Sequence, residues 1–196
     1  MLFRSRFVPF LQAFRERHPK VNLIVKDGSN SELQERLAQG DLDIAVYGQP
    51  EEIDERFQAR RLYDERFVIG VGPGHPFEKQ NAVRCADLHD QAYINRLQCE
   101  YFGAAGKIFR AQGAKTRIVF RSDRDDWVQS MAMAGLGFTF MPEYAVTMPG
   151  LRVRPLIDPE IARTIQVITV RGRPHVPAVG AFVREILAFN WANAPA

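Results

Sequence analysis

The sequence predicts an α/β fold made of two successive units, because helical and strand-like segments alternate along the whole chain. Apolar residues at helical spacing are followed repeatedly by short runs rich in β-branched residues, a pattern typical of a largely parallel sheet. The alternation restarts after "GPGHP", residues 72–76, which we take as a candidate crossing point between the units. A length of 196 residues suffices for one large domain or two small lobes.

The first unit opens with a helix, predicted by four apolar residues at helical spacing: Phe7, Phe10, Leu11 and Phe14. Pro9 is tolerated if it lies in the first turn of that helix. Runs rich in β-branched residues predict three strands, at residues 21–26, 42–48 and 66–72. Between the first two, a second helix is indicated, since Ser31 and Gln34 fit a capping box and Gly40 suits the C-terminal end.

The second unit repeats the alternation after Pro76. Strands are predicted at residues 92–97, 116–122, 151–156 and 164–172, and residues 138–145 are predicted to form a strand followed by a turn or short helix. Helices are predicted at residues 102–112 and 123–135, and Ser122 is a plausible cap for the second of these. A final amphipathic helix is predicted by Val179, Phe182, Val183 and Ile186.

The composition is that of an ordinary globular protein, with 46% hydrophobic and 25% charged residues. The net charge is +3, and the basic residues are scattered among 23 acidic ones rather than concentrated in a block, so this segment alone is not expected to bind DNA. No apolar run approaches the roughly 20 residues that span a bilayer, and the first ten residues lack the apolar core of a secretory signal. Two cysteines do not form a disulfide framework, so we expect a reducing, cytoplasmic setting.

The sequence offers no catalytic constellation. The four histidines are scattered and form no recognisable nucleophile–base pair, and no His/Cys cluster has zinc spacing. The "GLG" at residues 135–137 is read as a helix-to-strand turn, because a dinucleotide-binding fingerprint is absent. We therefore predict no enzyme activity, no metal and no cofactor.

A ligand site is expected outside the carboxyl ends of the strands, where helix N-termini favour anions. The loops at these positions carry Ser5, Ser29, Asn30, Tyr47, Arg96, Cys99 and Ser122. Arg4 and Arg96 are candidate countercharges for a carboxylate. Each residue also has a purely structural interpretation: the serines as helix caps, Tyr47 as packing, and Arg4 as a solvated charge.

Five motifs then occur in a recognisable order and cover nearly the whole chain: "FVPFLQAFRERHPKVNLIV", "GSNSELQERLAQGDLDIAVYG", "ERFVIGVGPGHPF", "MAMAGLGFTFMPEYA" and "VPAVGAFVREIL". Together they resemble the effector-binding (regulatory) domain of LysR-type transcriptional regulators. The resemblance implies a type 2 periplasmic-binding-protein-like fold, with two Rossmann-like lobes joined by two crossing strands and a small, anionic effector held between them. Lobe I would comprise residues 1–71 and 152–196, and lobe II residues 72–151.

The resemblance also implies a bacterial, cytoplasmic homodimer. DNA would be contacted only through an N-terminal helix-turn-helix domain with a linker helix, and neither lies within these 196 residues. The domain's own first strand is expected to be shortened or missing, because "MLFRSRFVPF" begins near the first strand-to-helix loop.

Three alternatives stay open on the sequence. One is a stand-alone solute-binding protein of the same fold, against which the absence of a secretion signal counts, and another is an enzyme on that fold. The third is a thiol-based redox sensor, since Cys99 matches the reactive cysteine of a peroxide-sensing branch of the family and Arg96 could lower its pKa. The branch's second cysteine is replaced here by Ile108, and Cys85 lies in a different setting.

Overall fold

The computed structural model describes residues 4–97 and 99–191, with side chains from Arg6 onward. The chain divides into two compact units, one holding the segments up to Asp64 and from Thr164, the other spanning Glu65–Arg163. The observed boundaries therefore fall after Asp64 and after Arg163, whereas the sequence predicts them after residues 71 and 151. The turn at residues 72–76 consequently lies inside the second unit and is not a crossing point.

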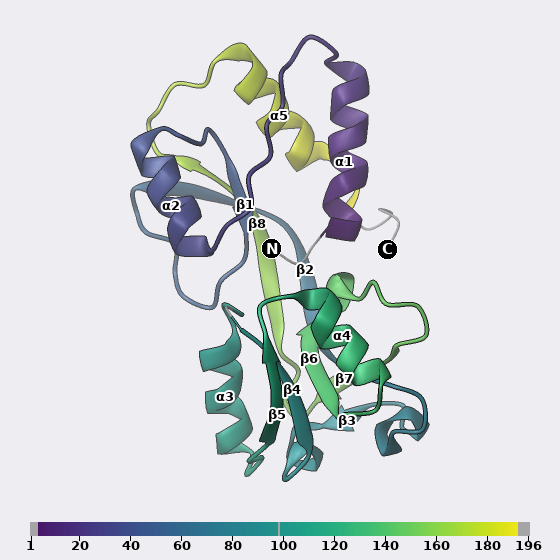
Figure 1. Cartoon of the computed structure of the whole chain (residues 1–196). Coiled ribbons are helices and arrows are strands. Elements are labelled where there is room, and N and C mark those ends of the chain that lie inside the picture. Colours follow the sequence, from purple (N-terminus) through teal and green to yellow (C-terminus); the bar gives the residue numbers. More distant parts are fainter. Residues whose placement is uncertain (1–3, 98, 192–196) are drawn as a thin grey trace. The chain divides into compact units, whose positions relative to one another are not determined.

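Two long strands connect the units, β2 (Phe57–Val71) and β8 (Ala162–Val170) (Figure 1). The sequence predicts only the apolar C-terminal part of β2, residues 66–72. Its first half is mostly polar, and only Phe57, Tyr63 and Glu65 are buried there. A strand that is half exposed carries too few apolar residues to stand out in the sequence.

The sheet of the second unit is mixed rather than largely parallel. β4 (Ala92–Arg96) lies parallel to both β5 (Arg117–Ser122) and β6 (Phe138–Pro142), whereas β2 is antiparallel to β6 and to β7 (Arg152–Ile157). The short β3 (Val83–Arg84) pairs in parallel with β7. Single 3-10 turns complete the unit, η1 (Pro76–Lys79), η2 (Cys85–Leu88) and η3 (Glu143–Ala145).

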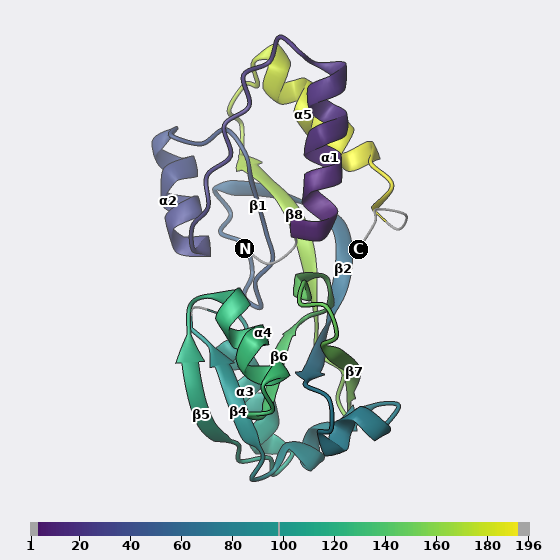
Figure 2. The same cartoon turned by 45° about the vertical axis from the view of Figure 1, so that its right-hand side comes forward.

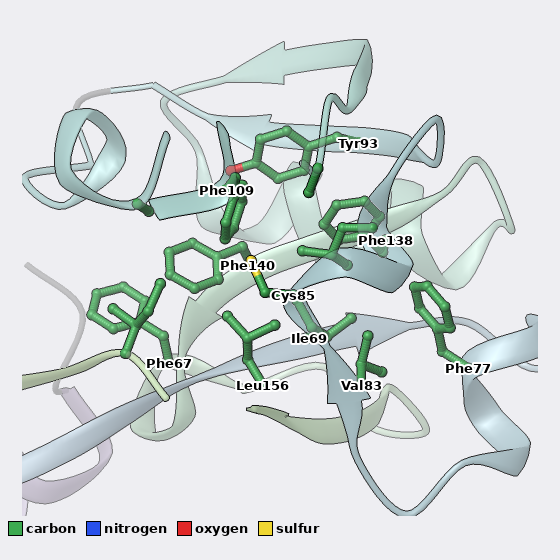
Figure 3. Packing of buried hydrophobic residues seen from close by; sticks show 14 of the residues in the cluster. Phe67, Ile69, Phe77, Val83, Cys85, Tyr93, Phe109, Phe138, Phe140 and Leu156 are labelled. Atoms are coloured by element: carbon green, nitrogen blue, oxygen red, sulfur yellow. The ribbon is translucent and has the colours of Figure 1, made fainter. Parts of the chain in front are cut away.

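Two helices cover opposite faces of this sheet, α3 (Phe102–Ala111) and α4 (Asp125–Met133) (Figures 1 and 2). Successive residues of β2 point to opposite faces of the sheet. Ile69 packs with Phe109 of α3 in one hydrophobic cluster, and Val68 packs with Val128 of α4 in another. The α3 face is rich in aromatic rings: Phe140 stacks on Phe67 at 4.6 Å (Figure 3). Cys85 is fully buried among these rings, so it is a core residue.

The first unit contains the helices α1 (Arg4–Arg17), α2 (Asn30–Gln39) and α5 (Pro177–Ala188), and the strand β1 (Ala45–Tyr47). β1 pairs antiparallel with β8. Phe10 and Phe14 of α1 meet the ring of Phe182 in α5 edge-on, at 5.0 and 4.9 Å. Pro9 lies in the second turn of α1, not in the first as expected.

Two further predictions in this unit are wrong. Residues 21–26 form no strand and pair with no neighbour among the described residues, and Ile24 and Val25 are 68% and 52% exposed. A β-rich sequence forms a strand only when another strand takes up its backbone hydrogen bonds. The α2 capping box consists of Ser29 and Glu32 rather than Ser31 and Gln34, because the helix begins at Asn30.

Candidate functional site

The carboxyl ends of β4 and β5 bring two predicted site residues together. Arg96 and Ser122 are register partners in the parallel pair, and the Leu97 N–H donates to the Ser122 carbonyl at 2.8 Å. The Ser122 hydroxyl accepts from the backbone N–H of Arg124 at 3.0 Å. Arg124 itself is the N-cap of α4, so Ser122 holds the turn before the helix and is not its cap.

Arg96 is already engaged by an acidic residue. Its Nε donates to Oδ1 of Asp125 at 2.6 Å, and the two side chains are only 11% and 19% exposed. Asp125 is the first residue of α4, where a carboxylate is also favoured by the helix dipole. An incoming anion would therefore have to share or displace the Asp125 carboxylate in order to pair with Arg96.

The first turn of α3 offers two backbone donors beside this strand end. The Phe102 N–H donates to the carbonyl of Cys99 at 3.0 Å, whereas the N–H groups of Gly103 and Ala104 have no acceptor within the described part of the chain. A Cβ added at Gly103 would meet nothing within 4 Å, so the backbone there is open. Unpaired N–H groups at a helix start are favourable positions for an anion.

Cys99 lies in the loop between β4 and α3, half-buried against the aromatic core. Burial raises the pKa of its thiol, and the nearby charge of Glu100 raises it further. A backbone hydrogen bond from Tyr101 and the charges of Arg96 and Arg163 act in the opposite direction with less effect. The pKa-lowering influence expected from Arg96 is thus outweighed, and the thiol is not activated.

A buried ion network lies next to Cys99 and was not predicted from the sequence. Arg163 of β8 donates from Nε to Oε1 of Glu65 in β2 at 2.6 Å, and it also bonds Glu100. The side chains of Arg163 and Glu65 are 1% and 0% exposed, and the guanidinium lies 5.6 Å from the centroid of the Phe67 ring. Burial raises the pKa of Glu65, an effect that the charge of Arg163 opposes.

One sequence signal could have drawn attention to Arg163. It occupies a buried position in the alternating pattern of β8, between the buried residues Ile161 and Ile165. A charge at such a position requires a partner, because an unpaired buried charge is very costly. The pattern gives no indication of which acid that partner is.

The predicted residues of the first unit gather where α2 begins. The Ser29 hydroxyl accepts from the Glu32 N–H, and the Glu32 carboxylate accepts from the Ser29 N–H at 2.7 Å. Asn30 donates from Nδ2 to the carbonyl of Gly48 at 3.1 Å, which ties the start of α2 to the end of β1. A Cβ at Gly48 would lie 2.6 Å from the carbonyl oxygen of Thr164, so this junction requires glycine.

Tyr47 is a packing residue in this structure. It is 3% exposed and shares a cluster with Leu33 and Leu37 of α2. Burial raises the pKa of its hydroxyl to about 12. Arg4 and Ser5 belong to the first turn of α1, and their side chains lie outside the described part of the chain.

The predicted residues therefore form two sets. Ser29, Asn30 and Tyr47 lie around the start of α2, and Arg96, Cys99 and Ser122 lie around the end of β4, each set within one unit. Over the described residues, no group of three or more His, Cys, Asp or Glu side chains could hold a metal ion. None of the described helices is long and apolar enough to cross a membrane.

Comparisons with known proteins place these observations in context. The family model described as LysR substrate binding domain matches residues 2–190. The transcriptional dual regulator GltC of Bacillus subtilis is 26% identical over 192 residues, which cover 94% of this chain and 63% of that protein. The DNA-binding transcriptional dual regulator OxyR of Escherichia coli is 28% identical over 162 residues, covering 80% of this chain and 52% of that one.

Solved structures agree on the fold. The regulatory domain of CcmR from Synechocystis PCC6803, in complex with 2-PG, superposes with a TM-score of 0.85 at 18% identity. The match covers 100% of this chain and 96% of that domain. The chain thus covers almost the whole of that domain, but less than two thirds of the length of GltC and OxyR.

Proposed function

The chain belongs to the LysR substrate-binding domain family and is the effector-binding domain of a LysR-type transcription regulator, and we propose that its effector is a small carboxylate or related anion. The family is one of regulators and not of enzymes. The fold class predicted from the sequence is confirmed by the solved structures.

One observation carries the proposal of an anion. In the second unit, β4 and β5 end side by side, with Arg96 opposite Ser122. The chain runs from the end of β4 directly into α3, whose first turn has the N–H groups of Gly103 and Ala104 without an acceptor among the described residues. All of these groups donate hydrogen bonds. A carboxylate bound there would accept from the α3 amides and would compete with Asp125 for Arg96. That the effector lies between the two lobes, with Ser5, Ser29, Asn30 and Tyr47 nearby, stays a prediction.

Thermal-shift titration with 2-PG and a panel of small mono- and dicarboxylates tests this proposal. Binding to the folded state alone raises stability by about 2.7 kcal/mol at a hundredfold excess over Kd. We expect stabilisation by at least one acid, and we expect Ser122→Ala and Arg96→Gln to weaken it. Ser130→Ala is the matched control, since the hydroxyl of this exposed serine donates to the Asp126 carbonyl within its own helix. Absence of stabilisation by every acid would count against the anionic effector.

Peroxide sensing is the second candidate function, favoured by the similarity to OxyR. The local chemistry gives it less support, because the pKa of Cys99 is raised and Ile108 stands where the second cysteine is expected. A lone thiol has no resolving partner for a disulfide switch.

The longer protein is proposed to act as a homodimer that contacts DNA through a separate domain. Binding of the effector would shift the equilibrium between two arrangements only if it binds one of them more tightly. Sedimentation of this chain with and without a stabilising acid would test the dimer.

A further inference from the structure

Asp125 places a hydrogen-bond acceptor at the site proposed for the anion. It is the first residue of α4, and its Oδ1 accepts from Nε of Arg96 at 2.6 Å. Its other carboxylate oxygen, Oδ2, accepts no hydrogen bond from the described residues, and it is not enclosed by them. Oδ2 is therefore an acceptor that a molecule entering from solvent can reach.

Asp125 and the open amides of α3 lie at the same end of the sheet. Because β4 and β5 are parallel, the loop from β4 to α3 and the loop from β5 to α4 leave the sheet at one edge (Figures 1 and 2). Two bonds join these loops, from the Leu97 N–H to the Ser122 carbonyl and from Arg96 to Asp125. A small molecule held at this edge lies between the starts of two helices.

A plain carboxylate suits this arrangement poorly. Arg96 and Asp125 compensate each other's charge, so Arg96 offers an anion little net attraction. Taking Arg96 away from Asp125 would leave a largely buried carboxylate without a partner, which is strongly unfavourable. An acid that leaves the ion pair intact accepts from the α3 amides instead, and the atoms beside its carboxylate then face Oδ2 of Asp125. An ionised carboxylate only accepts hydrogen bonds, so those atoms must include a donor.

We propose that the effector is a 2-hydroxy acid and that Asp125 is the residue that selects it, an inference that rests on the anionic effector proposed above. The carboxylate of the ligand accepts from the N–H groups of Gly103 and Ala104, and its hydroxyl donates to Oδ2 of Asp125. A neutral donor suits this position better than an ammonium group. The charge of Asp125 is already compensated, and a second cation would lie close to the guanidinium of Arg96.

Isothermal titration calorimetry with acids that differ only at the second carbon tests the role of the hydroxyl. The two sets are propionate, lactate and alanine, and succinate, malate and aspartate. We expect a hydroxy acid to bind at least about tenfold more tightly than the other members of its set, because hydrogen bonds to charged groups are among the stronger ones.

Two kinds of failure are distinguishable in this titration. Equal affinities within both sets, tightest binding of an amino acid, or binding of another acid when both hydroxy acids fail would overturn the present proposal and leave an anionic effector in place. Absence of binding by every acid would overturn both proposals.

Asp125→Asn tests the selecting residue. If Oδ1 still accepts from Arg96, the amide nitrogen replaces Oδ2, so that a donor faces the ligand instead of an acceptor. We expect the hydroxy acid and the acid without the hydroxyl to bind within about twofold of each other. Asp126→Asn is the matched control, because this neighbouring carboxylate is exposed and pairs with Arg124, and it should retain the preference. If Asp125→Asn weakened all acids equally and kept the preference, Asp125 would have only a structural role and the proposal would be overturned.

Discussion

Arg163 shows how one buried charge can hold distant parts of a chain together. It is paired with Glu65, 98 residues away, and with Glu100, 63 residues away. Glu65 and Arg163 are also the first and last residues of the second unit. The loop that carries Cys99 is thus fastened to both crossing strands where they enter that unit.

Removing the guanidinium should destabilise the protein strongly. We expect Arg163→Met to lower the free energy of unfolding by about 3–5 kcal/mol, because Glu65 is left as a buried, unpaired acid. Urea denaturation measures the change. The double variant Arg163→Met/Glu65→Leu should recover part of the loss, since Glu65 then no longer leaves an unpaired acid in the core, whereas Glu100 still lacks its partner. A loss below about 0.5 kcal/mol for the single variant would show that the network contributes little.

The thiol of Cys99 should react slowly at neutral pH. Because burial and Glu100 raise its pKa, a smaller fraction is thiolate at pH 7 than for free cysteine. We expect iodoacetamide to alkylate Cys99 more slowly than free cysteine, and the rate to rise with pH through an inflection above that of free cysteine. Mass spectrometry of the labelled chain follows the rate, and Cys99→Ser identifies the site. A rate at pH 7 above that of free cysteine would revive the redox hypothesis.

At the scale of elements, the start of α2 can be tested directly. Ser29→Ala removes the capping hydroxyl and should cost about 1 kcal/mol of stability. Ser31→Ala is the matched control two residues later, and it should cost less, because Ser31 lies inside the helix. Chemical denaturation of both variants distinguishes the observed capping box from the one predicted by the sequence. A larger loss for Ser31→Ala would contradict the structure.

Helices were predicted more accurately than strands, for a physical reason. The apolar stripes of α1, α2 and α5 recur at helical spacing within a single segment, so the pattern is complete in the sequence. A strand depends on its neighbours. Residues 21–26 are rich in β-branched residues, yet no described strand pairs with them. The first half of β2 lies in the sheet, yet its residues show no apolar pattern.

At the scale of the molecule, the second unit is a continuous segment inserted into the first. Residues 63–165 include its entire sheet and both of its helix faces. We expect this fragment to fold alone, with dispersed NMR signals and cooperative unfolding. Residues 1–64 alone should not fold, since Phe10 and Phe14 then lack Phe182, and β1 lacks β8. A disordered 63–165 fragment would show that the units are not independent.

The part of the candidate site that could be predicted from the sequence is the part set by the strand topology. Arg96 and Ser122 meet because parallel strands end at the same edge of a sheet, a rule that applies before any coordinates are known. The pairing of Arg96 with Asp125 and the burial of Tyr47 depend on side-chain packing. No spacing rule in the sequence encodes either of these, and the same holds for the ion network around Arg163.

Among the residues that the structure describes, β1 pairs with β8 along one edge and with no strand along the other, and this open edge matters for the purification of the chain. An unpaired strand edge beside exposed aliphatic residues such as Ile24 and Val25 can pair with the same edge of another molecule. Concentrated solutions of these 196 residues would then self-associate into β-rich aggregates. Charged substitutions at positions 24 and 25, placed as gatekeepers, should keep the chain dispersed.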